Sequence, residues 1–180
     1  CIRDSNWSVD WKDYGTVDGT FYAAPMLANV KGYVWYSPAQ FTAWGVEVPQ
    51  TWDDLIALTK TIQEKTGKAP WCAGFASGDA SGWPGTDWIE DLVLRQAGPD
   101  TYDKWVSGDV KFTDQPIKDA FDAVGSILLN PSYVNAGFGD VKSINSTAFA
   151  DVAAKVADGS CALTHQASVS YTHLRAHETD

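Results

Sequence analysis

The chain has 180 residues, a formal net charge of −10 at pH 7 and a sequence pI near 4.5. This length supports one good-sized hydrophobic core, or one domain together with part of another. The acidic balance argues against nucleic-acid binding, because a phosphate backbone needs a Lys- and Arg-rich surface to replace its counterions. No stretch of the sequence approaches the roughly 18 consecutive apolar residues of a membrane-spanning helix. Nine Trp residues are unusually many, and several lie in Gly-, Pro- and Asp-rich stretches.

The first third of the sequence predicts short strands and one helix. Residues 1–20 are predicted to form loops around short pieces of structure. Apolar runs at 20–24 and 32–37 predict two strands, and Pro38 is expected to end the second. The segment Thr51–Asp54 resembles a capping box and predicts a helix that carries an apolar stripe and ends at a glycine, Gly67.

The remaining sequence predicts alternating strands, loops and helices. A Gly-rich loop at 76–86 precedes a helix that is predicted to be capped by Thr86 or Asp87 and to run through Gln96. The other predicted elements are a strand at 69–75, helices at 100–106, at 117–128 and from 149 to Gly159, a loop at 135–145 and a strand at 161–165. Because strands and helices alternate, we expect an α/β architecture in which helices cover a central sheet.

Four stretches together resemble one protein family. Gly19–Pro25 followed by Gly32–Tyr36, and then Val48–Leu55, are similar to segments of the extracellular solute-binding proteins of sugar ABC importers. Gly82–Trp88 and Gly159–Ser168 resemble the α-glucoside-binding branch of that family. Each motif alone is weak, but the four occur in the right order, and the resemblance extends over most of the chain.

The resemblance implies part of a two-lobe, periplasmic-binding-protein-like (type II) fold that binds sugar between its lobes. Residues 1–32 would form the end of the first lobe, and residues 33–168 a hinge strand and an incomplete second lobe. Residues 169–180 follow no hydrophobic period and resemble a translated sequencing-adapter read-through, so we expect this tail to be non-native.

Trp83 is the leading candidate for a sugar-binding residue. A sugar ring has an apolar C–H face and a rim of hydroxyls, so its site needs an aromatic platform with polar groups at the edge. Trp83 lies in the predicted Gly- and Pro-containing loop, and the alternative is that it covers the core. Asp87 is the natural hydroxyl acceptor, or else an N-cap or first-turn acid of the next helix. Trp88 is expected to pack in the core.

Three further residues are expected to face the cleft. His165 and Gln166 follow the last predicted strand, where the resembling family directs side chains into the cleft. Tyr36 lies at the end of the hinge strand, and it either faces the cleft or is a buried strand tyrosine.

A secreted glycoside hydrolase fragment is the alternative from another functional class. Asp87 would act there with Glu90 or Asp91, but a hydrolase needs two carboxyls on opposite sides of one bond. Three acids on one helical turn more often form a solvated face, so we expect no catalytic residue and no enzyme. A passive carbohydrate-binding module is disfavoured, since such modules are usually β-sandwiches and this sequence has long helical stripes.

No metal ion or other cofactor is expected. Outside the suspect tail the only histidine is His165, and no nucleophile elbow or phosphate-binding loop is present. His173 and His177 have the i, i+4 spacing of metal ligands, but they lie in the tail and lack the accompanying Glu. Cys72 and Cys161 occupy positions that carry cysteines in the resembling branch, which implies a disulfide between them.

The family resemblance implies the function of a non-catalytic importer subunit. It would capture an α-glucoside-type oligosaccharide such as maltose or trehalose, close around it and dock on ABC transporter permease subunits. Its partners would be the oligosaccharide and the permease, with membrane contact only through the permease or a lost lipid anchor. A disulfide implies an oxidising, extracytoplasmic location, so the protein would be periplasmic or a cell-surface lipoprotein.

Overall fold

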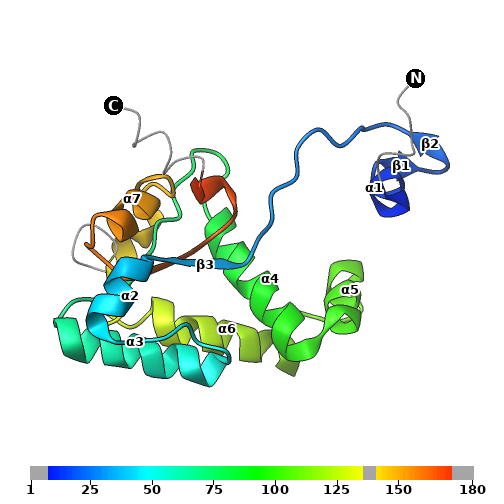
Figure 1. Ribbon diagram of the computed structural model, residues 1–180. Helices are drawn as coiled ribbons and strands as arrows, with labels where there is room; N and C mark the ends of the chain where they lie inside the picture. Colours follow the sequence, from blue (N-terminus) through cyan, green and yellow to red (C-terminus); the bar gives the residue numbers. More distant parts are fainter. Residues whose placement is uncertain (1–7, 136–140, 172–180) are drawn as a thin grey trace. The chain divides into compact units, whose positions relative to one another are not determined.

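The computed structural model describes residues 8–135 and 141–171. The chain divides into two compact units, residues 1–30 and 31–180, and each unit has its own secondary structure (Figure 1). The assignment of residues to lobes stays a prediction.

The first unit contains a short helix and a two-stranded hairpin. Helix α1 (Val9–Tyr14) precedes strands β1 (Thr16–Val17) and β2 (Thr20–Phe21), which pair in antiparallel fashion. Asp18 and Gly19 connect the strands with positive φ angles of 50° and 75°. Two consecutive positive φ angles are typical of tight hairpin turns, whose twist matches that of the strands. The strand predicted to start at Thr20 is present and ends at Phe21.

The second unit is built on a mixed sheet, and this confirms the predicted α/β class. Within the described residues, the strands lie in the order β3–β6–β4–β5. Strand β3 is antiparallel to β6, whereas β5 and β6 are parallel to β4. The strands are β3 (Tyr33–Tyr36), β4 (Trp71–Cys72), β5 (Val134–Asn135) and β6 (Leu163–Gln166).

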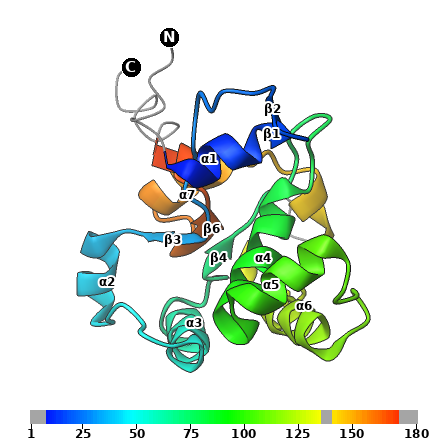
Figure 2. The same cartoon turned by 90° about the vertical axis from the view of Figure 1, so that its right-hand side faces the viewer.

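Helices lie on both faces of this sheet (Figure 2). Trp88 of α4 packs on one face, where Trp71 and Leu163 belong to the main core. Helix α7 lies on the other face, with a smaller buried cluster. The helices are α2 (Pro38–Trp44), α3 (Trp52–Thr66), α4 (Trp83–Ala97), α5 (Pro99–Ser107), α6 (Gln115–Leu128), the 3₁₀ helix η2 (Val141–Asn145) and α7 (Asp151–Ala157).

Helix α3 begins as its sequence predicts. The Thr51 hydroxyl accepts a hydrogen bond from the Asp54 amide at 3.1 Å, and the Asp54 carboxylate accepts one from the Thr51 amide at 3.0 Å. The side-chain hydrogen bond with Thr51 is the main reason that the pKa of Asp54 is lowered. The predicted capping box is thus confirmed, and the helix ends at Gly67 in the left-handed conformation.

The sequence prediction missed α2 and placed the start of α4 too late. Pro38 ends β3 as expected, but it also opens a helix, because its fixed φ angle and missing N–H suit the first helical turn. Helix α4 starts at Trp83, with Gly82 before it at φ 102° and Pro84 in its first turn. Neither Thr86 nor Asp87 is the cap, since the Gly-Trp-Pro sequence begins the helix earlier.

A disulfide joins β4 to the segment that leads into β6. Cys72 and Cys161 are bonded, with their Cα atoms 5.8 Å apart, and they are 89 positions apart in sequence. Val152 and Val156 of α7 complete the buried cluster around the bond. The disulfide implied by the family resemblance is therefore present.

Candidate functional site

The predicted site residues Trp83 and Asp87 lie together at the start of α4, joined by a lysine. The Lys31 ammonium is 3.0 and 3.3 Å from the two carboxylate oxygens of Asp87. The same ammonium lies over the indole of Trp83, 4.5 Å from the ring centre. The Asp87 side chain is only 8% exposed, and a nearly buried charge needs a partner. The half-exposed Lys31 side chain supplies it.

Phe149 connects Trp83 to the end of β6. Its ring contacts the indole edge-to-face, with the ring centres 5.0 Å apart. Its carbonyl oxygen accepts a hydrogen bond of 2.6 Å from the side-chain amide of Gln166. Gln166 also accepts a hydrogen bond from the Ser170 hydroxyl. The start of α4 and the end of β6 therefore meet through Phe149, although Gln166 itself is fully buried.

His165 belongs to a second group, one turn further along α4. Its imidazole stacks on Trp88 with the ring centres 4.1 Å apart, and its Nε2 lies 3.4 Å from a carboxylate oxygen of Asp91. Arg95 binds Asp91 from the other side at 2.9 Å. Burial by itself would raise the pKa of Asp91, but the hydrogen bonds and charges of His165 and Arg95 outweigh it and lower that pKa.

Tyr36 lies on the same side of the sheet as this second group. It is 37% exposed and packs against Phe41 with the ring centres 4.4 Å apart, so it is not the buried strand tyrosine of the alternative interpretation. A cavity of about 580 Å³ is lined by Tyr36, His165, Asp91 and Trp88, among other residues. Trp83 and Asp87 do not line this cavity.

The five predicted ligand-binding residues therefore form two groups. Trp83 and Asp87 lie together, and Gln166 is connected to Trp83 through Phe149. Tyr36 and His165 line the cavity on the other face of β6. Consecutive residues of a strand point to opposite faces of its sheet, which separates His165 from Gln166. Their joint role in ligand binding stays a prediction.

The acids of α4 are engaged in separate interactions. Asp87 and Asp91 are paired with cations, and Glu90 accepts a hydrogen bond of 3.0 Å from the Tyr102 hydroxyl. Burial first, and then this bond to Glu90, raise the pKa of Tyr102. A general acid needs a raised carboxyl pKa, and that of Asp91 is lowered.

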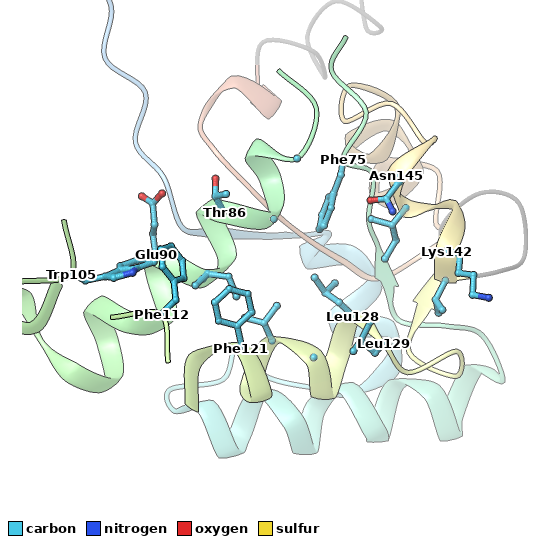
Figure 3. A pocket seen from close by; sticks show the side chains of 17 residues that line it. Phe75, Thr86, Glu90, Trp105, Phe112, Phe121, Leu128, Leu129, Lys142 and Asn145 are labelled. Carbon is cyan, nitrogen blue, oxygen red and sulfur yellow. The ribbon is translucent and has the colours of Figure 1, made fainter. Parts of the chain in front are cut away.

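A larger and strongly apolar cavity lies beside α4 and α6. It measures about 650 Å³, and Figure 3 shows Phe121 and Leu128 rising from α6 with Phe75 pointing toward them from the opposite side. Trp105 and Phe112 add further aromatic surface. None of the five predicted ligand-binding residues lines this cavity.

The parts of the chain that the structure describes contain no group of three or more His, Cys, Asp or Glu residues suited to a metal ion. His173 and His177 lie outside the described residues. Of the suspected tail, residues 169–171 form a helical turn in which Ser170 is buried, and 172–180 also lie outside the described residues.

Sequence reasoning missed Lys31 and Phe149. Lys31 lies 56 positions before Asp87, and no local pattern distinguishes it from any other surface lysine. Phe149 was assigned to the apolar stripe of a helix, but it precedes α7 and contacts Trp83 instead. The sequence does carry a glycine next to Lys31: Gly32 has a φ angle of 77°, which favours glycine, and it immediately precedes β3.

Comparison with known proteins agrees with this architecture. The family model described as bacterial extracellular solute-binding protein matches residues 3–167. The chain belongs to this family.

Two curated relatives and one solved structure illustrate how this solute-binding protein compares. It is 46% identical over 127 residues to the osmoprotective compounds-binding protein GgtB of Synechocystis sp., covering 71% of this chain and 30% of GgtB. It is 43% identical over 164 residues to the alpha-glucosides-binding periplasmic protein AglE of Rhizobium meliloti, covering 89% and 35%. The bacterial solute receptor AcbH, described as having an exclusive preference for β-D-galactopyranose, superposes with a TM-score of 0.67 at 26% identity, covering 92% and 38%.

The chain thus spans about a third of the length of the curated relatives that it matches. The predicted fold is confirmed as a mixed α/β fragment of the solute-receptor fold. Among residues 8–135 and 141–171, no helix has both the length and the hydrophobicity needed to cross a membrane.

Proposed function

We propose that this solute-binding protein captures an α-glucoside at the start of α4 and delivers it to the permease of an ABC importer. The observation that carries the proposal is the half-buried indole of Trp83 beside the ion pair of Asp87 and Lys31. An indole face suits the C–H face of a sugar, and the carboxylate and ammonium at its edge suit hydroxyls.

The similarity to AglE supports the α-glucoside class, because that relative is an alpha-glucosides-binding periplasmic protein. Its periplasmic location, together with the disulfide in this chain, supports an extracytoplasmic location here as well. Closure of two lobes around the sugar would present the shape that the permease recognises.

The hydrolase alternative is not favoured. The named relatives are binding proteins, and the lowered pKa of Asp91 is opposite to what a general acid requires. Incubation with maltose tests this alternative directly, because released glucose would indicate an enzyme, whereas a binding protein returns the sugar unchanged.

The proposal is tested by substituting Trp83 and titrating maltose and trehalose by calorimetry. We expect Trp83→Ala to weaken binding by about 1–3 kcal/mol, the cost of losing an aromatic platform, with little change in Tm. Trp105→Ala is the matched control, because it removes a half-buried indole from the apolar cavity and should leave the affinity unchanged. Equal affinities for wild type and Trp83→Ala would remove Trp83 from the site.

A further inference from the structure

The face of the proposed platform is covered by a group of the protein itself. The Lys31 ammonium lies 4.5 Å from the centre of the Trp83 ring, where a stacking sugar would need to approach. Phe149 contacts the same indole edge-to-face and restricts its movement. A ligand that stacks on the ammonium-covered face therefore competes with a group of the protein itself.

Lys31 is held there by two interactions of different strength. Its side chain is 50% exposed, so the contact with the indole is a cation–π interaction at a half-solvated site, which is among the weaker ones. Asp87 is 8% exposed, and separating its carboxylate from the ammonium would leave a nearly buried charge without a partner. The contact with the indole is thus the easier of the two to break.

We propose that Lys31 is a specificity-determining residue of this site, which selects uncharged, hydroxyl-rich ligands over cationic ones. Its ammonium covers Trp83, and it moves aside for the ligand while remaining paired with Asp87. The inference rests on the proposed function and adds to it a basis for ligand selection.

The selectivity follows from the charges. Without Lys31, the Asp87 carboxylate beside an indole face would attract a cation, because both groups favour positive charge. With Lys31 in place, the ammonium balances the negative charge of the carboxylate, and a cationic ligand is repelled by the ammonium. A hydroxyl donates and accepts hydrogen bonds at once, so it can accept from Lys31 and donate to Asp87.

The test compares maltose with its 2-amino-2-deoxy analogue by calorimetry, at a mildly acidic pH where the amine is charged. Wild type should prefer maltose. Lys31→Gln keeps hydrogen-bond donors but removes the charge, and it should shift the ratio of the two dissociation constants by about 10-fold in favour of the amine. Lys31→Arg should retain the wild-type ratio. Lys60→Gln is the matched control, since Lys60 pairs with Glu64 on the surface of α3.

A ligand-free measurement accompanies the titrations. The indole N–H resonance of Trp83, assigned by its loss in Trp83→Phe, should shift in Lys31→Gln and stay in place in Lys60→Gln. An unshifted Trp83 resonance in Lys31→Gln would overturn the inference. A wild type that binds the amine as tightly as maltose would also overturn it, and this result does not depend on the folding of any variant. Sugar binding with an unchanged ratio in Lys31→Gln would do the same and leave the proposed function intact. Absence of maltose binding by the wild type would count against the proposed function itself.

Discussion

Asp91 connects the sheet, α4 and the start of β3 through a single carboxylate. His165 and Arg95 approach it from two sides, and the backbone of Gly32 passes so close that an added Cβ would lie 2.7 Å from one of its oxygens. The carboxylate therefore has little room to change its position. The Asp91 carboxylate is thus held both by its charged and polar partners and by the close packing of the Gly32 backbone.

We expect the pairing of Asp91 to appear in the pH dependence of stability. Because the pKa of Asp91 is lower in the folded protein than its ordinary value of about 3.9, the ionised group stabilises the fold above that pH. This contribution is lost as the pH falls through the folded pKa. Asp91→Asn should lower the free energy of unfolding at neutral pH and flatten its decline in acid, as measured by urea unfolding at a series of pH values.

Asp79→Asn is the comparison for this experiment, because Asp79 is an exposed carboxylate in the loop before α4. Its unfolding curves should follow those of the wild type. If Asp91→Asn showed the full acid-induced decline of the wild type, the stabilising role assigned to Asp91 would be wrong.

At the scale of elements, β3 depends on the glycine that precedes it. Gly32 has a φ angle of 77°, which a residue with a Cβ adopts only at a cost of about 1–2 kcal/mol. At Gly32 the added methyl group would also press against Asp91, which is held by its two partners.

Gly32→Ala should therefore destabilise the protein more than the left-handed conformation alone requires. Gly45→Ala provides the matched control, since Gly45 has a φ angle of 62° and nothing within 4 Å of the added Cβ. We expect the control to cost about 1–2 kcal/mol in urea unfolding and Gly32→Ala to exceed it. Equal losses would show that Asp91 yields without penalty.

The success of prediction from sequence also differs between elements. The capping box of α3, with Thr51 and Asp54 three positions apart, is local, and the sequence predicted it correctly. Trp88 was correctly expected in the core, because helical spacing reports which face is buried. Helix α2 was missed because Pro38 was interpreted only as the end of a strand, although proline also favours the first turn of a helix.

Only part of the candidate site could be predicted from the sequence, because local patterns do not reveal contacts between residues that are far apart in the chain. Trp83 and Asp87 are four positions apart, and one helix brings them together. Lys31 reaches them from 56 residues before Asp87, with β3, α2, α3 and β4 in between. The opposed directions of His165 and Gln166 follow from strand alternation, but only once the extent of β6 is known.

At the scale of the whole molecule, the disulfide connects distant parts of the second unit. Cys72 lies on β4 and Cys161 just before β6, so the bond closes a loop that contains α4, α5, α6 and α7. Cross-linking residues so far apart restricts the unfolded chain strongly. In the chain-entropy model, a loop of this length stabilises the fold by about 4–5 kcal/mol.

Reduction of this bond should thus cause a large loss of stability. We expect urea unfolding in the presence of a reductant to show a free energy lower by about 4–5 kcal/mol, and Cys72→Ser with Cys161→Ser to reproduce it without reductant. Cys1→Ser serves as the control, because it removes the remaining cysteine and leaves the bond intact. An unchanged midpoint on reduction would exclude the disulfide as a major source of stability.

The placement of two indoles on the first turns of α4 has a spectroscopic consequence. Trp88 lies beneath the imidazole of His165, and Trp83 lies beneath the ammonium of Lys31. Indole fluorescence depends on the groups next to the ring, so the emission of Trp88 should report on its stacking with the imidazole of His165. The emission wavelength of Trp83 should shift when a different group replaces the Lys31 ammonium beside its ring. The helix therefore carries two intrinsic fluorophores in different surroundings, one stacked on an imidazole of the sheet and the other beneath an ammonium.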